Sequence, residues 1–145
     1  INAEVEADTI LLDLLREKGC YSVKRGCETA NCGLCTVLMN KKSVLSCSIL
    51  AVQADGQEIV TLEGMQKEAE EFGDFLANEG AEQCGFCNPG FIMNVFAMLE
   101  EIEEPTEEEI LEYLAGNLCR CSGFVGQTRS ILKFLEYKKG GKKKA

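Results

Sequence analysis

The stretch 26–47 restricts the fold more than any other part of the chain, because it holds four of the nine cysteines at fixed spacing. Successive cysteines are separated by four, two and eleven residues, in the order Cys27, Cys32, Cys35 and Cys47. Three thiolates on one tight loop and a fourth on a returning strand form a pocket for a small inorganic cluster. Gly26 and Gly33 fit such a loop, because a chain folded closely around a cluster needs residues that tolerate positive φ and close backbone approach.

The spacing is that of plant-type [2Fe-2S] ferredoxins and predicts a cluster of that kind. Zinc is an alternative, although zinc sites usually combine two Cys-x2-4-Cys pairs, whereas here one loop carries three ligands. A disulfide framework is disfavoured, because nine is an odd number of cysteines and a chain of 145 residues can bury a core without covalent links. Thiols at ligand spacing favour a reducing, cytoplasmic location.

Composition excludes several other classes of function. The chain contains no histidine, so it cannot form a Ser-His-Asp or Cys-His nucleophile, a Rieske centre or a histidine-containing zinc site. The net charge is -9 although five of the fifteen basic residues lie within 138–145, so the rest is strongly acidic and is not expected to bind nucleic acid. The longest apolar run, 91–99, is interrupted by Asn94 and is too short to span a bilayer.

Hydrophobic periodicity predicts an α+β unit over residues 1–64, with a cluster site at one edge. Its helix is expected at 10–18, capped by Asp8 or Thr9 and ended by Gly19. Its strands are expected at 1–7, 36–39, 43–47 and 57–62, with a turn at 40–42. Because such a sheet normally begins with a pair of strands, we expect that a first strand is missing from this sequence.

Past residue 64 the apolar period changes to 3.6 residues, which is typical of helices. Helices are expected at 66–79, at 89–102, from 106 onward and at 126–139. Asn88 is the predicted N-cap of the second helix, and Thr106 with Glu109 has the spacing of a capping box. Short links between four helices predict a four-helix bundle over 65–138, followed by a flexible Lys- and Gly-rich tail at 139–145.

Two links of this helical part contain the second set of candidate metal ligands. They are Cys84, Cys87, Cys119 and Cys121, and each pair directly precedes a predicted helix. Since a [2Fe-2S] cluster with four thiolates is an anion, helix N-termini and Arg120 would stabilise it. The spacing alone leaves zinc open here, while the upstream loop favours a second iron-sulfur cluster. Cys20 is left over and is expected to be a half-buried apolar residue.

Three blocks of sequence carry a resemblance to a known family: GCETANCGLCTV at 26–37, QCGFCNPG at 83–90 and GNLCRCSGF at 116–124. They resemble the iron-sulfur subunits of the molybdenum hydroxylases, the xanthine dehydrogenase and aldehyde oxidoreductase family. The similarity covers nearly the whole chain in the right order. It implies a plant-type ferredoxin (β-grasp) domain followed by an all-α, four-helix domain with a second [2Fe-2S] cluster.

The same resemblance implies a role for each motif residue. The implied ligands of a distal cluster are Cys27, Cys32, Cys35 and Cys47, and those of a proximal cluster are Cys84, Cys87, Cys119 and Cys121. Gln83 and Cys121 match the positions that approach the pterin of the molybdenum cofactor. Taken without the resemblance, Gln83 would be an ordinary exposed residue.

The resemblance further implies an electron-transfer subunit that carries out no substrate chemistry itself. Its expected partners are a large molybdopterin-binding subunit and a FAD-binding subunit, in a duplicated hetero-oligomer. The first expectation for the substrate of the complex is a purine, with nicotinate, aldehydes, carbon monoxide and aromatic acyl thioesters open. Two rivals are a stand-alone zinc module and a free ferredoxin-like carrier or redox sensor. Exposure of the apolar residues Phe86, Phe91, Ile92 and Phe124 would favour docking to a partner.

Overall fold

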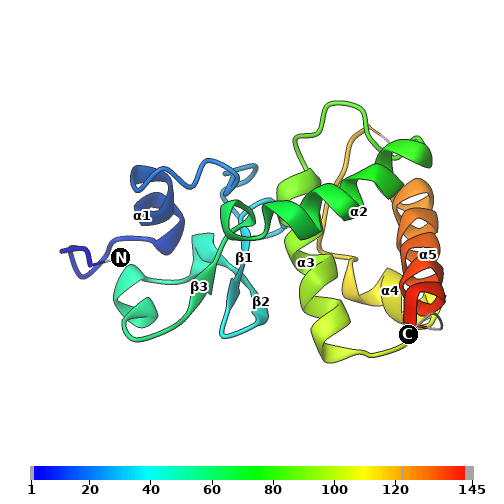
Figure 1. Cartoon of the computed structure of the whole chain (residues 1–145). Coiled ribbons are helices and arrows are strands. Elements are labelled where there is room, and N and C mark those ends of the chain that lie inside the picture. Colours follow the sequence, from blue (N-terminus) through cyan, green and yellow to red (C-terminus); the bar gives the residue numbers. More distant parts are fainter. Residues whose placement is uncertain (1, 122, 143–145) are drawn as a thin grey trace.

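The computed structural model describes residues 2–121 and 123–142, which form a sheet-containing part and a helical part (Figure 1). The sheet-containing part comprises α1 (Leu11–Glu17), β1 (Thr36–Met39), β2 (Lys42–Leu45) and β3 (Ile59–Val60). The helical part comprises α2 (Gln66–Asn78), α3 (Asn88–Glu101), α4 (Glu107–Tyr113) and α5 (Gly123–Lys142). The expected combination of a small sheet with a helical second part is therefore confirmed. No helix in the described ranges is long and apolar enough to cross a membrane.

The sheet is antiparallel and has the strand order β2-β1-β3. The predicted hairpin turn is present, and Asn40 and Lys41 adopt positive φ values of 52° and 69° in it. β2 ends at Leu45, before the predicted end at residue 47, because a 3-10 turn at Ser46–Ser48 follows. β3 is shorter than the predicted strand 57–62, because a 3-10 helix begins at Leu62 and runs over Leu62–Gly64.

The segment before α1 differs from the prediction. The described residues of the predicted strand 1–7 contain no strand, and every side chain of residues 2–8 except Val5 is exposed. Alternating apolar and polar residues form a strand only where a neighbouring strand or a core face pairs with them, and this segment packs against neither. Neither Asp8 nor Thr9 caps α1. The N-cap residue is Ile10, and the N–H of Leu11 donates instead to the carbonyl of Ile49 at 2.8 Å.

The core of the sheet-containing part lies between α1 and the sheet. Leu11, Leu12 and Leu15 of α1 are buried in one cluster with Val37 of β1. Gly19 follows the helix with a φ of 91°, which confirms its predicted role as the residue that ends α1. Cys20 is half-buried against this core, as predicted for the cysteine outside the ligand spacing.

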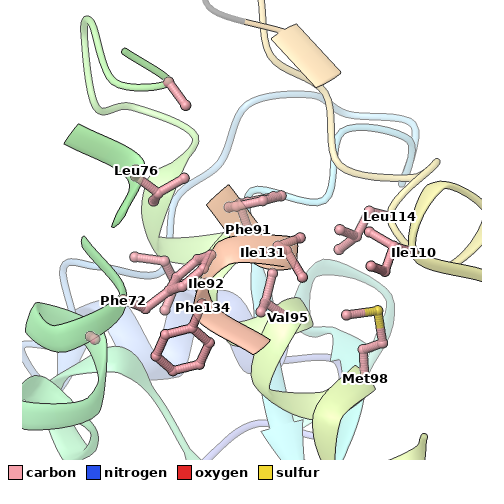
Figure 2. Packing of buried hydrophobic residues seen from close by; sticks show 12 residues of the cluster. Phe72, Leu76, Phe91, Ile92, Val95, Met98, Ile110, Leu114, Ile131 and Phe134 are labelled. Carbon is pink, nitrogen blue, oxygen red and sulfur yellow. The ribbon is translucent and has the colours of Figure 1, made fainter. Parts of the chain in front are cut away.

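Helices α2, α3, α4 and α5 share one hydrophobic core (Figure 2). Phe72 of α2 packs edge-on against Phe134 of α5, with ring centroids 5.2 Å apart. Val95 and Met98 of α3 and Ile110 of α4 are fully buried in the same cluster. This shared core is the part of the predicted four-helix bundle that the contacts establish.

The helix ends match the prediction in part. Thr106 and Glu109 form the predicted capping box at the start of α4. The N-cap of α3 is Cys87, one residue before the predicted Asn88, which is the first residue of the helix. α5 is longer than predicted and continues to Lys142, so the predicted tail is helical over 139–142, and 143–145 lie outside the described residues.

α3 packs directly on β1 and joins the two parts of the molecule (Figure 1). Leu38 of β1 forms a buried cluster with Met93 and Ala97 of α3. The first turn of α3 approaches the backbone of the loop 26–35 at Gly90. A Cβ atom there would clash with the carbonyl oxygen of Gly33 and would lie 2.9 Å from Cα of Leu34. Close contact at this point therefore requires glycine.

Candidate metal centres

The first four predicted ligands come together at one edge of the sheet-containing part. The thiol of Cys32 is close enough to shift the pKa of Cys27, and the thiol of Cys47 is close enough to shift the pKa of Cys35. The two pairs also interact with each other electrostatically, through Cys32 and Cys35. Cys32 and Cys35 are buried, with 8% and 3% of their surface exposed, while Cys27 and Cys47 are half-buried. The loop 26–35 and Cys47 together thus bring four thiols side by side, two of them buried.

Backbone turns of this loop direct N–H groups toward sulfur. The N–H of Asn31 donates to Sγ of Cys27 at 3.4 Å, directly after Ala30, which adopts a positive φ of 55°. Hydrogen bonds from the backbone N–H groups of Thr29 and then Asn31 lower the pKa of Cys27 to about 6. The loop is therefore arranged to hold a thiolate at neutral pH before any metal binds.

The two glycines of the loop serve different purposes. Gly33 has a φ of 72°, and a Cβ there would lie 2.6 Å from the carbonyl oxygen of Gly116. At Gly26 a Cβ would lie 2.7 Å from Cδ2 of Leu34, the end of a flexible side chain that can shift, and 3.2 Å from Sγ of Cys32. Gly33 thus requires glycine for packing against backbone atoms and for its backbone conformation, whereas Gly26 is closely packed only against side chains.

The pKa values of the two buried thiols, Cys35 and Cys32, are raised, in contrast to that of Cys27. Burial raises the pKa of Cys35 to about 11 and also raises that of Cys32. The backbone around them is held by two hydroxyl groups: Ser46 Oγ donates to the carbonyl of Cys35, and Thr36 Oγ1 to that of Gly33, both at 2.7 Å. Because metal ligation requires thiolates, binding at this site must release protons from the inner pair.

The second predicted set is also arranged in pairs, although its members come from two distant links. Sγ of Cys121 lies 3.6 Å from Sγ of Cys84, and the thiol of Cys119 is close enough to raise the pKa of Cys87. Two thiolates on one tetrahedral metal, with bonds of about 2.3 Å, lie about 3.8 Å apart. The Cys84–Cys121 distance fits two ligands of one metal ion and is far too long for a disulfide.

The pairs of the second set differ in exposure. Cys84 and Cys121 are exposed, whereas Cys87 and Cys119 are half-buried. Burial, followed by the effect of Cys119, raises the pKa of Cys87 to about 11. The backbone N–H of Phe86 lowers the pKa of Cys84, and the neighbouring Cys84 raises that of Cys121. One side of this site is therefore open to the surface.

Both sets fit a [2Fe-2S] cluster. Each iron of such a cluster takes two thiolates, and each set offers two adjacent pairs. Within residues 2–121 and 123–142, no three His, Cys, Asp or Glu side chains converge on a position for a single ion. In the described part of the chain, both sites therefore offer pairs of thiols, which suit the two irons of a cluster.

The two cysteine sets are in direct contact through their loops. The N–H of Leu118, next to Cys119, donates to the carbonyl of Cys32 at 3.0 Å. Asn117, which is 6% exposed, donates through Nδ2 to the carbonyl of Gly33 at 3.4 Å. Asn94 of α3 in turn donates to Oδ1 of Asn117 at 2.6 Å.

This junction was not predicted from the sequence. The available signal was Asn94 itself, a polar residue that interrupts the apolar run 91–99. A buried amide in such a run needs a hydrogen-bond partner, and here that partner is Asn117.

The remaining predicted residues lie around the second site. Gln83 and Arg120 are exposed beside the exposed ligands. Phe91 and Ile92 are buried in the helical core, so they cannot contribute to a docking surface. Phe86 and Phe124 are exposed, at 49% and 42%, and two further exposed apolar residues that the sequence analysis did not single out are Leu118 and Val125.

Comparison with known proteins agrees with this geometry. A family profile described as "2Fe-2S iron-sulfur cluster binding domain" matches residues 1–76, and one described as "[2Fe-2S] binding domain" matches residues 61–132. The xanthine dehydrogenase iron-sulfur-binding subunit of Escherichia coli O157:H7 is 49% identical over 128 residues, which are 86% of this chain and 80% of the relative. The nicotinate dehydrogenase small FeS subunit of Eubacterium barkeri is 45% identical over 123 residues, 83% of this chain and 78% of the relative.

The fold is also similar to a solved structure. The aldehyde oxidoreductase from Desulfovibrio gigas aligns with a TM-score of 0.88 and 32% identity, over 97% of this chain and 16% of that chain. The chain belongs to the iron-sulfur subunits of the xanthine dehydrogenase and aldehyde oxidoreductase family. The resemblance carried by the three cysteine motifs is thereby confirmed, and so are two [2Fe-2S]-binding domains.

Proposed function

We propose that this iron-sulfur subunit passes single electrons from a molybdenum centre, through two [2Fe-2S] clusters, to a flavin. In this proposal the proximal cluster is bound by Cys84, Cys87, Cys119 and Cys121, and the distal cluster by Cys27, Cys32, Cys35 and Cys47. Helices α2, α3, α4 and α5 form the four-helix domain around the proximal cluster. Molybdopterin and FAD belong to partner subunits of a duplicated hetero-oligomer.

The observation that carries the proposal is the short covalent and hydrogen-bonded connection between the two sites. From Cys119 the chain leads to the N–H of Leu118, which donates to the carbonyl of Cys32 at 3.0 Å. One ligand from each set is thus linked through a single hydrogen bond. Such a connection fixes the two sites close to each other, as electron transfer between them requires.

Bound clusters would supply one-electron storage, so two of them in series can take the two electrons of a reduced molybdenum centre one at a time. The chain's own residues set the position and surroundings of the clusters. Burial of Cys32 and Cys35 excludes water from the inner side of the distal site. Backbone N–H groups at Cys27 and Cys84 provide hydrogen bonds to thiolates.

Exposure of Cys84 and Cys121 supports an entry point for electrons at the proximal site. The exposed apolar residues of this region, namely Phe86, Leu118, Phe124 and Val125, would dock on the molybdopterin-binding subunit. Gln83 and Cys121 would be the residues nearest the pterin, and Arg120 would add a positive charge between two ligands. For the substrate of the complex we propose a purine, while nicotinate and aldehyde oxidation are the alternatives indicated by the relatives.

Low-temperature EPR of the dithionite-reduced protein, with iron, sulfide and zinc measured on the same sample, tests the proposal. We expect two distinct reduced [2Fe-2S] signals and about four irons per chain, as two sets of four cysteines require. Zinc without an EPR signal would overturn electron transfer and leave a structural module. One cluster together with zinc would retain the ferredoxin site and overturn the two-cluster pathway.

A further inference from the structure

The inward stripe of α5 contains a buried polar residue where an apolar one is expected. Ile131 and Phe134 are fully buried in the helical core, and Gln127 lies four and seven residues before them on the same face. Only 3% of the surface of Gln127 is exposed. Burying an amide costs free energy unless it is hydrogen-bonded, so its presence here points to a specific partner.

That partner is a candidate cluster ligand. Nε2 of Gln127 donates to Sγ of Cys87 at 3.9 Å, across forty residues of sequence. Cys87 is the more enclosed member of the Cys84-x2-Cys87 pair and stands at the N-cap of α3. A side chain from α5 therefore reaches a ligand carried by α3, and the contact depends on the packing of these helices.

We propose that Gln127 raises the reduction potential of the proximal cluster by donating an N–H···S hydrogen bond to the Cys87 thiolate. This inference rests on the proposed function, because it requires a cluster at Cys84, Cys87, Cys119 and Cys121. Reduction adds negative charge to a cluster, and a hydrogen-bond donor to a ligand sulfur stabilises that charge. The hydrogen bond lies on the enclosed side of the site, where Gln127 is buried, so its effect is stronger than in water because the local dielectric is lower.

Helix α5 also contains a matched control. Ser130 is fully buried on the same helix, but its Oγ donates to the carbonyl of Gly126 at 2.8 Å, within the helix itself. Ser130→Ala therefore removes a buried polar group of α5 without removing a donor to a cysteine. Any potential shift that results only from altered packing of α5 should occur in this variant too.

The experiment is an EPR-monitored redox titration of the full chain with both clusters, in the wild type and in Gln127→Met, Gln127→Glu and Ser130→Ala. Methionine has nearly the volume of glutamine and no N–H donor, so Gln127→Met should lower the potential of the proximal cluster. The distal potential should stay unchanged. Gln127→Glu should shift the proximal potential further in the same direction, because its carboxylate adds negative charge. The proximal signal is assigned with Cys32→Ala, which removes the distal cluster.

Two results would overturn the inference. In the first, Gln127→Met shifts the proximal potential no more than Ser130→Ala does. In the second, both clusters shift equally, which would indicate a general change in structure. In either case the proposed function stands, because both clusters are present. A wild-type chain without a proximal cluster would instead overturn the proposed function and this inference together.

Discussion

The two candidate cluster sites are built in different ways. In the distal site the loop 26–35 provides three thiols, and its own turns at Ala30 and Gly33 shape the pocket. The proximal site is formed from two links, and its pairs join residues that are far apart in sequence, such as Cys84 and Cys121. The first site thus depends mainly on local backbone conformation, whereas the second depends on how the helices pack.

The sites also differ in how they face solvent. At the distal site both inner thiols are buried: Cys32 lies at the junction with the helical part, and Cys35 lies in the core beneath α1. At the proximal site Cys84 and Cys121 are exposed on the molecular surface. The comparison indicates that the first site is more enclosed than the second, and it can be tested by changes that affect one site and not the other.

The largest expected effect is the loss of one cluster at a time. Cys32→Ala removes a distal ligand and Cys87→Ala a proximal ligand, so each variant should retain about two of the four expected irons. EPR should show that each variant keeps the signal of the other site, because the ligand sets share no cysteine. Loss of both signals in either variant would contradict the separation of the two sites.

The next effect concerns thiol reactivity in the cluster-free chain. The pKa of Cys27 is about 6 and that of Cys87 about 11, so near pH 7 the first is mostly thiolate and the second almost entirely thiol. Allowing for the greater nucleophilicity of the more basic thiolate, alkylation of Cys27 should be about a hundredfold faster. Iodoacetamide labelling followed by peptide mass spectrometry measures both rates.

The pH dependence of this labelling provides the control. The rate at Cys27 should level off above about pH 7, because the thiol is then ionised, while the rate at Cys87 should keep rising toward pH 11. Equal rates and parallel pH profiles would show that the loop at Cys27 does not stabilise a thiolate.

The contrast between local backbone conformation and helix packing also decides how much of each site can be predicted from the sequence. Ligand spacing is a local property, so the sequence alone indicated both sets of four cysteines, which the structure brings together, and the helices that follow them; the role of these cysteines as cluster ligands stays a prediction. The N-terminal strand could not, because alternation of side chains does not show whether a pairing partner is present.

The contacts between the two sites are tertiary and have no local pattern. The roles of three residues depend on such contacts. Asn117 and Gly90 contact the carbonyl of Gly33 in the loop 26–35, and Gln127 contacts Cys87 within the helical part. A buried polar residue at an apolar position, as at Asn94 and Gln127, is the signal that sequence reasoning can use in such cases. It indicates that a partner exists but does not identify it.

A change at the junction should have the third largest effect. In Gly90→Ala the new Cβ would clash with the carbonyl of Gly33, a backbone atom that cannot move aside freely. We expect a loss of about 1–3 kcal/mol in the free energy of unfolding, with both EPR signals weakened. Urea denaturation followed by the visible absorbance of the clusters measures it.

Gly73→Ala in α2 is the matched control. A Cβ at Gly73 has no neighbour within 4 Å, and alanine is the better helix former, so this variant should be more stable by about 0.5–1 kcal/mol. Equal effects of the two substitutions would mean that the close contact at Gly90 has no energetic importance.

The smallest expected effect is at Lys24, which reaches from the sheet-containing part to the proximal loop. Its Nζ donates to the carbonyl of Phe86 at 3.2 Å and lies 4.7 Å from the centroid of the Phe86 ring. Because Phe86 is exposed, Lys24→Met should lower the free energy of unfolding by only about 0.5–1 kcal/mol, and it should weaken the proximal site alone.

Two variants serve as controls for Lys24→Met. Lys24→Arg keeps the positive charge and should retain most of this stability. Lys18→Met removes a surface pair with Glu17 and should change neither site. If Lys24→Met instead destabilised the distal cluster, the assignment of the Lys24 side chain to the proximal site would be wrong, because the substitution leaves the backbone hydrogen bond from Lys24 N–H to the carbonyl of Leu34 in place.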